Sequence, residues 1–326
     1  MGQTIDIAAL AAGVCSGDRR ALARAITLVE SGRADHQAQA MDLLQAVGTD
    51  RQALRIGLSG TPGVGKSTFI ESLGLMLTGM GKRVAVLAVD PSSARSGGSI
   101  LGDKTRMELL SRDPMAFIRP SPSQTQLGGV ARRTREAVAL CEAAGFDIVL
   151  IETVGVGQSE TVVAQMSDLF LLLLAPAGGD ELQGVKRGIM EIADLILVNK
   201  ADGDLKSQAT RTCADYAGAL RLLRKRPQDP DGFPKALTVS ALETVGIKAA
   251  WKEVEDLIGW RKSGPVWQDN RQAQARFWFA EEVRLQLLAR LTSDPDLLAR
   301  MTALEQQVAA GNMTPTAAAA NVVDAI

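Results

Sequence analysis

Seven short apolar runs, separated by stretches with helical spacing, constrain the fold of this chain more than any other feature. The runs cover residues 54–58, 84–89, 116–118, 148–151, 169–174, 195–198 and 236–239. Several are apolar at every position, as expected of parallel strands that are covered on both faces. Alternating strands and helices predict an α/β domain with a doubly wound parallel sheet flanked by helices. In such a domain, functional residues lie at the carboxyl ends of the strands.

The residues on either side of this region have helical patterns without strands. Two sets of apolar residues before it recur at helical spacing: Leu22, Ile26 and Val29, then Met41, Leu44 and Val47. After about residue 245 the chain looks helical to its end. We therefore expect an N-terminal helical region at 1–50, an α/β domain at 51–262 and a C-terminal helical arm at 263–326.

The C-terminal part holds all four tryptophans, at positions 251, 260, 267 and 278, and the run FWF at 277–279. Clustered aromatic residues are typical of an interface. The same side chains are equally suited to packing the arm on its own domain, so both interpretations stay open.

Composition excludes several classes of protein. The 326 residues are 46% hydrophobic and 22% charged, with a net charge of −1, so no basic excess favours nucleic acid or an acidic membrane. Three scattered cysteines argue against a disulfide framework or a zinc site, and the single histidine, His36, argues against histidine-based catalysis. No transit-type N-terminus and no apolar run of 18 residues occur, so we expect a cytoplasmic protein without a membrane span.

The stretch GLSGTPGVGKST has the GxxxxGK[ST] spacing of a phosphate-binding loop and follows the first apolar run. Its glycines let backbone N–H groups turn inward, and the following helix N-terminus adds positive potential. Lys66 is expected to reach the β- and γ-phosphates, and the Ser67 hydroxyl to bind Mg²⁺. The predicted nucleotide-binding residues here are Gly60, Thr61, Pro62, Gly63, Val64, Gly65, Lys66, Ser67 and Thr68.

A second motif, NKAD, follows the run at 195–198 and predicts guanine recognition. The Asp202 carboxylate can accept from both N1–H and the 2-amino group of guanine, whereas adenine offers it no matching donors. Asn199 is expected to hold the loops together, and the Lys200 stem to lie along the purine face. The stretch VSALE resembles a short loop whose backbone N–H reaches guanine O6, and it adds Ser240, Ala241 and Leu242.

Two acidic residues and an arginine follow the second apolar run. Asp90 stands at its end, and Asp103 and Arg106 lie in the polar, glycine-rich loop beyond it. Such loops order around a γ-phosphate. Asp103 is expected to orient the attacking water and Arg106 to face phosphate. The plain alternatives are a helix N-cap for Asp103 and a helix-surface arginine for Arg106.

The stretch DIVLIETVGVGQSE raises the question of why an apolar run ends in a carboxylate. Glu152 occupies the aspartate position of a DxxG motif, followed by Gly155. A carboxylate at this point must face a positive group or be solvated. Val156, not glutamine, follows Gly155, which predicts slow intrinsic hydrolysis and stimulation by a partner.

Taken together, the phosphate loop, DPSS, GDKTRM, ETVGVGQSE, GGDELQGVKRGI and NKAD resemble the MeaB/ArgK family of P-loop GTPases over nearly the whole chain. The resemblance implies a P-loop NTPase fold and a homodimer formed through the C-terminal helices. It also implies a GTPase chaperone that protects adenosylcobalamin-dependent methylmalonyl-CoA mutase and gates its cofactor loading.

The same resemblance assigns roles to residues. Asp90, Asp103 and Glu152 match acidic positions around Mg²⁺ and the attacking water, and Gln183 and Lys186 match positions tied to partner-activated hydrolysis. Without the resemblance, Lys186 is interpreted as a solvated helix lysine.

Other functions fit these residues less well. A small-molecule kinase of the arginine/ornithine type requires an acceptor pocket, and an ATP-dependent kinase has no use for NKAD. A metal-insertion GTPase needs Cys and His clusters, which this chain lacks. A regulatory GTPase without a metalloenzyme client stays open.

Overall fold

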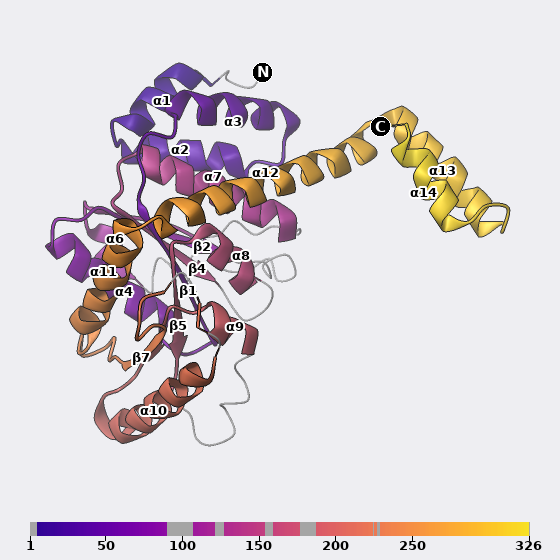
Figure 1. Ribbon diagram of the computed structural model, residues 1–326. Coiled ribbons are helices and arrows are strands. Elements are labelled where there is room, and N and C mark those ends of the chain that lie inside the picture. Colours follow the sequence, from indigo (N-terminus) through magenta and orange to yellow (C-terminus); the bar gives the residue numbers. More distant parts are fainter. Residues whose placement is uncertain are drawn as a thin grey trace. The chain divides into compact units, whose positions relative to one another are not determined.

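The computed structural model describes residues 5–89, 107–120, 127–153, 159–176, 187–223, 225–226 and 229–325. The chain divides into two compact units, Met1–Arg271 and Gln272–Ile326. The first unit contains a seven-stranded sheet in the order β3-β2-β4-β1-β5-β6-β7 (Figure 1). All neighbouring strands are parallel. The predicted α/β class is therefore confirmed.

Each strand begins within one residue of a predicted apolar run. The strands are β1 (Leu54–Gly60), β2 (Val84–Val89), β3 (Ala116–Arg119), β4 (Ile148–Thr153), β5 (Leu169–Leu174), β6 (Leu195–Val198) and β7 (Lys235–Thr238). Two strands, β1 and β4, extend two residues past the predicted runs, and β4 was expected to end at Ile151. Glu152 instead pairs with Leu58 of β1 and with Ala88 of β2, so the carboxylate belongs to the strand.

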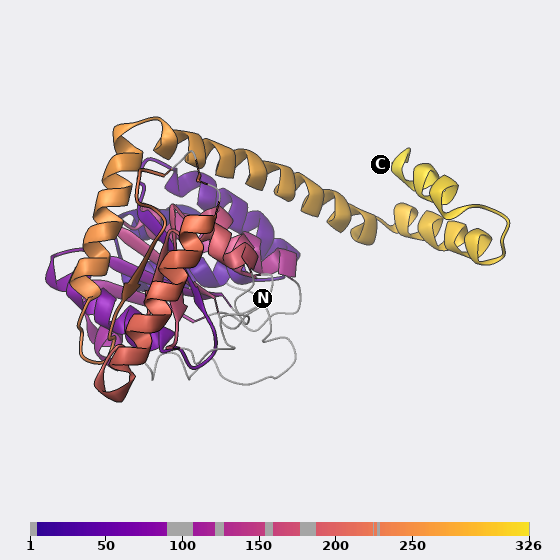
Figure 2. The same cartoon turned by 60° about the horizontal axis from the view of Figure 1, so that its bottom comes forward.

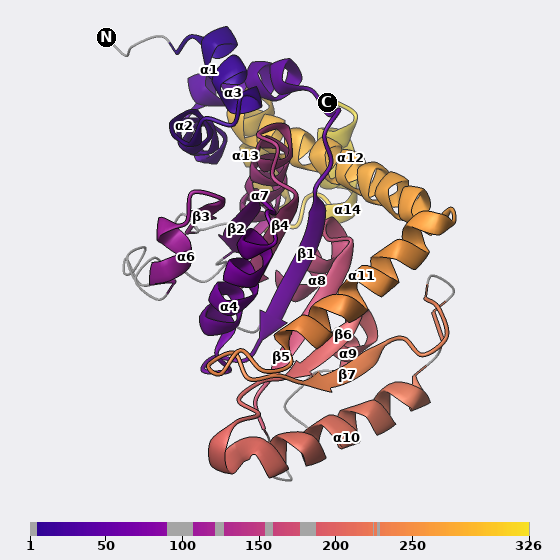
Figure 3. The same ribbon diagram turned by 90° about the vertical axis from the view of Figure 1, so that its left-hand side faces the viewer.

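Helices cover both faces of the sheet. The three helices α4 (Lys66–Gly79), α6 (Glu108–Arg112) and α11 (Ile247–Ser263) share one buried core with alternate strand residues such as Ile56 and Leu58 (Figure 3). Gly57, between them, points to α8 (Ser159–Met166) on the other face, where a Cβ would lie 2.9 Å from Val163. That face is also contacted by α7 (Leu127–Ala143) and α9 (Arg187–Ile192), and α10 (Lys206–Leu222) packs on β6 and β7.

Three helices precede the sheet: α1 (Ile7–Cys15), α2 (Arg19–Glu30) and α3 (Ala34–Val47). They pack on one another and on α7, which lies beside α2 in Figure 1. The predicted apolar face of α2, with Leu22, Ile26 and Val29, is buried. In α3 the buried residues are Ala40 and Leu43, whereas Met41 is 56% exposed, so the helix is as predicted but its buried face is not.

The chain ends in α12 (Val266–Ser293), α13 (Pro295–Ala309) and α14 (Pro315–Val323), drawn in orange to yellow in Figure 2. The division between the two units falls within α12. Large apolar side chains are exposed along this helix at Phe277, Phe279, Val283, Leu287 and Leu288. Within the described part of the chain, every helix is too short or too polar to cross a membrane.

Three aspartates stand directly before a strand and hold the neighbouring strand at the amino edge of the sheet. The Asp168 amide donates to the Arg55 carbonyl at 2.8 Å, and its Oδ2 accepts from the Arg55 amide at 2.8 Å. Asp147 is bonded to Arg83, and Asp194 to Phe170, in the same way. In both pairs the aspartate amide donates to the partner's carbonyl at 2.9 Å, and the aspartate Oδ2 accepts from the partner's amide at 2.7 Å. We call these three pairs the aspartate bridges.

Candidate nucleotide-binding site

The phosphate loop, residues 60–67, leaves β1 and enters α4 at the carboxyl edge of the sheet. Gly65 has a φ of 90°, and a Cβ there would lie 2.8 Å from Asn199 Nδ2. A Cβ on Gly60 would lie 2.4 Å from the Leu173 carbonyl oxygen. Backbone this close to its neighbours, with a left-handed φ at Gly65, requires glycine at both positions.

Lys66, the first residue of α4, folds its side chain back along the phosphate loop. Its Nζ donates to the carbonyl oxygens of Gly60 at 2.7 Å and Thr61 at 3.3 Å. The ammonium group therefore lies at the positive end of a 14-residue helix, an arrangement that attracts phosphate. Ser67 is half-buried and Thr68 exposed beside it.

Asn199 connects the phosphate loop to a second loop, residues 240–245, which we call the base loop. The side chain is buried, with 2% exposed. Its Nδ2 donates to the Val64 carbonyl at 2.9 Å, and its Oδ1 accepts from the Ala241 amide at 2.9 Å. One amide group thus joins segments that are 135 and 42 residues away in the chain.

The base loop is closed on itself and is attached to Asp202. The Ser240 amide donates to the Val245 carbonyl at 2.9 Å, and the Glu243 amide donates to Ser240 Oγ at 3.0 Å. Ser240 Oγ also donates to Asp202 Oδ2. Leu242, at the tip, is 78% exposed. Because Ser240 orients the Asp202 carboxylate, the position of the base loop decides where that carboxylate points.

Two residues of α4 that were not predicted as site residues contact segments next to the site. The Ser72 hydroxyl donates to the Ala241 carbonyl at 2.6 Å. Glu71 Oε1 accepts from the Leu109 amide at 2.8 Å, at the start of α6. The sequence did hold a signal for Ser72, since it lies four residues after Thr68 and therefore on the same face of the helix.

At the end of β4, Glu152 is buried, with 4% exposed, between β1 and β2. The next residue, Thr153, donates its hydroxyl to Ser59 Oγ at 2.9 Å. This bond joins the last residue of β4 to the residue before Gly60, and so connects the strand that carries Glu152 to the root of the phosphate loop.

Lys200 follows Asn199 with a φ of 58°. Six other predicted site residues lie outside the described residues: Asp90, Asp103, Arg106, Gly155, Gln183 and Lys186. Of the predicted magnesium ligands, Ser67 and Glu152 both lie at the carboxyl edge. A hydroxyl and a carboxylate are oxygen donors, which is the ligand chemistry that Mg²⁺ prefers. Within the described part of the chain, no three His, Cys, Asp or Glu side chains cluster as a metal site.

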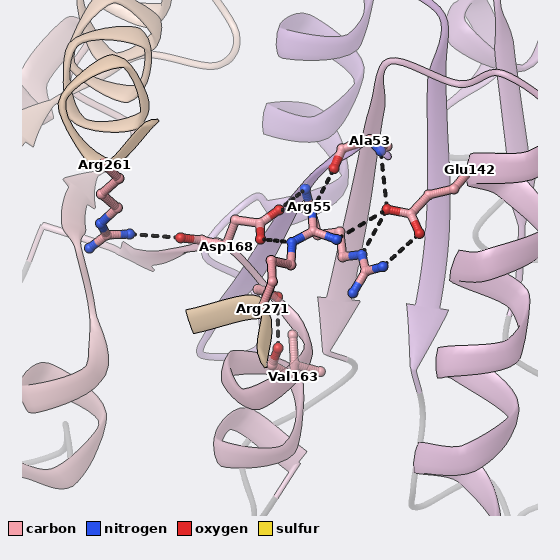
Figure 4. Close-up of polar contacts among 8 residues, drawn as sticks. Ala53, Arg55, Glu142, Val163, Asp168, Arg261 and Arg271 are labelled. Carbon is pink, nitrogen blue, oxygen red and sulfur yellow. Dashed lines mark hydrogen bonds and ion pairs between the residues drawn. The ribbon is translucent and has the colours of Figure 1, made fainter. Parts of the chain in front are cut away.

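A separate cluster of charges, which the sequence did not reveal, lies at the amino edge of the sheet (Figure 4). Arg271 Nε and Nη2 donate to the two Asp168 carboxylate oxygens, each at 2.6 Å. Arg55 Nε and Nη2 donate to the two Glu142 oxygens at 2.9 and 2.6 Å. Arg261 Nη1 donates to the Asp168 carbonyl at 2.6 Å. We call these five residues the arginine clamp.

The clamp is deeply buried. The side chains of Arg271 and Asp168 are 9% and 1% exposed. Burial raises the pKa of the Asp168 carboxyl, whereas Arg271 and the Arg55 amide act in the opposite direction. The clamp lies at the edge of the sheet opposite the phosphate loop, so its role is to hold β1, β5, α7, α11 and the first turns of α12 together, and not to bind nucleotide.

Comparison with known proteins identifies close relatives. The family model for "Methylmalonyl Co-A mutase-associated GTPase MeaB" matches residues 22–296. A Caulobacter vibrioides protein, named only for a GTPase activity, is 53% identical over 97% of this chain and 96% of its own length. The mouse protein "Methylmalonic aciduria type A homolog, mitochondrial" is 48% identical over 94% of this chain and 76% of its own length.

A solved structure has the same fold as this chain. The crystal structure of a protein called "LAO/AO transport system kinase" superimposes with a TM-score of 0.76 at 37% identity, covering 99% of both chains.

Proposed function

Because this chain belongs to the MeaB family of methylmalonyl-CoA mutase-associated GTPases, we propose that its GTP hydrolysis serves that mutase, as a chaperone that protects the enzyme and gates its loading with adenosylcobalamin. The observation that carries the nucleotide part of this proposal is the connection from the phosphate loop through Asn199 to the base loop. The mutase part rests on the family description and on the relatives' names.

The proposed chemistry is attack of an in-line water on the γ-phosphate. Lys66 binds the β- and γ-phosphates, and Asp103 orients the water. Ser67, Asp90, Asp103 and Glu152 would hold Mg²⁺, which when bound neutralises charge on the phosphate oxygens. Asp202 binds the guanine base, the Lys200 stem lies along the purine face, and Asn199 holds the surrounding loops together. Arg106, Gln183 and Lys186 are proposed to complete the site when the partner binds.

We propose that the protein forms a homodimer, that it works in the cytoplasm, and that it binds neither nucleic acid nor membrane. The exposed apolar side chains of α12 support association with a second copy, because contiguous apolar surface of this kind is costly in water. We keep the domain limits 1–50, 51–262 and 263–326, with the last as the dimerisation arm.

A kinase is the second candidate, since one protein of similar structure bears the name of a kinase. The motif NKAD favours a guanine nucleotide instead, because the Asp202 carboxylate matches the donors of guanine and not those of adenine. A kinase would also transfer phosphate to an organic acceptor, whereas a GTPase releases it as inorganic phosphate.

The proposal is tested by measuring GTP turnover of the purified protein with and without purified methylmalonyl-CoA mutase. We expect stimulation of at least roughly tenfold, because completing the charged groups around the γ-phosphate contributes large factors in GTPases. Lys186→Ala should lose the stimulation, while Lys82→Ala, an exposed lysine at the opposite edge of the sheet, should keep it. Turnover that the mutase leaves unchanged would contradict the partner assignment.

A further inference from the structure

We propose that Ser72 is a positioning residue for guanine recognition, because it fixes the base loop against the helix that begins at the phosphate loop. This inference rests on guanine-nucleotide binding and not on the mutase partner. Ser72 is proposed to act on the base through Ala241, whose carbonyl accepts its hydroxyl.

The Ala241 residue is held from both sides. Its amide donates to Asn199 Oδ1 at 2.9 Å, and its carbonyl accepts from the Ser72 hydroxyl at 2.6 Å. Asn199 in turn donates to Val64 at 2.9 Å. The bonds form a closed circuit from the phosphate loop through Asn199 and Ala241 to Ser72, and back along α4 to the phosphate loop.

This circuit matters for base selectivity because the base loop is internally closed. The bonds of Ser240 to Val245 and Glu243 make the loop a compact turn. A compact turn is displaced as one body when an anchor is removed. Ser240 moves with the loop, and its hydrogen bond then no longer holds the Asp202 carboxylate in the same orientation. Removing the Ser72 hydroxyl should therefore disturb the groups that recognise guanine.

The local burial makes the Ser72 hydroxyl hard to replace. Ala241 is only 3% exposed, so water has little access to the carbonyl that Ser72 satisfies. A buried acceptor that loses its donor costs free energy comparable to a lost hydrogen bond. Phe69 and Leu73, in the same stretch of α4, face the apolar core, whereas the Ser72 hydroxyl is directed to the base loop.

The test compares Ser72→Ala with Ser72→Thr, which keeps a hydroxyl. Dissociation constants for GDP and for ADP are measured by displacement of a fluorescent guanine nucleotide. ADP probes the phosphate loop alone, since its base lacks the donors that Asp202 accepts. We expect Ser72→Ala to weaken GDP binding about fivefold, the factor that one ordinary hydrogen bond represents, and to leave ADP binding unchanged. Ser72→Thr should restore most of the GDP affinity.

A matched control is Ser263→Ala. That serine also donates its hydroxyl to a backbone carbonyl, Trp260 at 2.8 Å, but it lies at the end of α11. It should change neither dissociation constant. Equal weakening of GDP and ADP in Ser72→Ala would overturn the proposal, since it would show a general distortion of α4 and the phosphate loop. Unchanged GDP affinity would overturn it as well. Absence of GDP binding by the unmodified protein would instead contradict the nucleotide assignment itself.

Discussion

The two edges of the sheet are held in different ways. At the carboxyl edge, the phosphate loop and the base loop are joined by hydrogen bonds of neutral groups, such as Asn199 to Val64 and Ser72 to Ala241. At the amino edge, the arginine clamp joins β1 to α7 and the start of β5 to α12 through paired charges, and Arg261 adds α11 through a backbone carbonyl. Neutral hydrogen bonds contribute about 1 kcal/mol each, whereas bonds between charged partners are roughly twice as strong.

This difference separates two tasks within one sheet. The amino edge is suited to stability, because breaking a buried charge pair is costly. The carboxyl edge is suited to binding, because weaker bonds let the loops open to admit and release a nucleotide. Substitutions at the two edges should therefore affect different measurements.

The largest effect is expected from Asp202→Asn at the carboxyl edge. The asparagine cannot accept from both N1–H and the 2-amino group of guanine, so GTP affinity should fall on the order of a thousandfold, the sum of two charge-assisted bonds. Xanthine carries a carbonyl in place of the 2-amino group, and the asparagine amide can donate to it. Affinity for XTP should therefore rise. Displacement titrations with both nucleotides measure this.

The control for this change is Asp204→Asn, an exposed aspartate two residues along the chain. It should leave both affinities unchanged, and the thermal midpoint of Asp202→Asn should stay close to that of the unmodified protein. A variant that lost GTP affinity only together with its stability would contradict the separation of the two edges.

The second largest effect is expected from Asp168→Ala, at the amino edge of the sheet. Asp168→Ala leaves the buried Arg271 without its carboxylate partner, although Arg271 keeps the Ala53 carbonyl at 2.8 Å and Glu142 at 3.4 Å. The expected loss is about 3 kcal/mol in the free energy of unfolding, near the lower end for a broken buried pair. Urea denaturation measures it. GDP affinity, measured well below the unfolding transition, should be unchanged.

The exposed pair of Lys225 and Asp231 provides the control. Both side chains are almost fully exposed, at 88% and 95%, and Lys225→Ala should leave the urea midpoint unchanged. If Asp168→Ala were as harmless as this control, the arginine clamp would not be the main support of the amino edge.

The smallest effect is expected from Gly65→Ala. Alanine at a φ of 90° is strained, and its Cβ would lie 2.8 Å from Asn199 Nδ2, so GDP affinity should fall about tenfold. Gly79→Ala, at the end of the same helix and with no atom within 4 Å of the added Cβ, should be neutral or slightly stabilising. Similar affinities of both variants would show that the phosphate loop tolerates a side chain facing Asn199.

The sequence predicted the sheet closely because short apolar runs alternate along the chain with stretches of helical spacing. Glu152 was placed outside β4 because a charged residue is not expected inside a buried strand. The backbone nevertheless keeps pairing to Thr153, two residues further. The buried face of α3 was misjudged because Met41 and Leu43 are similarly apolar, and only the packing of α3 against its neighbours decides which of them is buried.

The candidate site was predicted in part, because the glycine spacing and NKAD are local motifs. The arginine clamp was missed since its members are far apart, Arg55 and Arg271 being more than two hundred residues from each other. A signal existed: an aspartate directly precedes each of β4, β5 and β6. It was not recognised because functional residues are expected at the carboxyl ends of the strands. Ser72 was missed, although it lies on the helix face of Thr68, because its partner Ala241 is 169 residues away in the chain.

The aspartate bridges have a consequence for how the chain folds. In each bridge, the aspartate and its partner bond through both backbone and side chain only when the two strands start at matching residues. A strand that paired one residue out of step would bury a carboxylate away from its donor and turn its side chains to the wrong face. Misaligned pairings of β5 with β1, of β4 with β2 and of β6 with β5 would therefore be short-lived, so the aspartates select the alignment of the sheet.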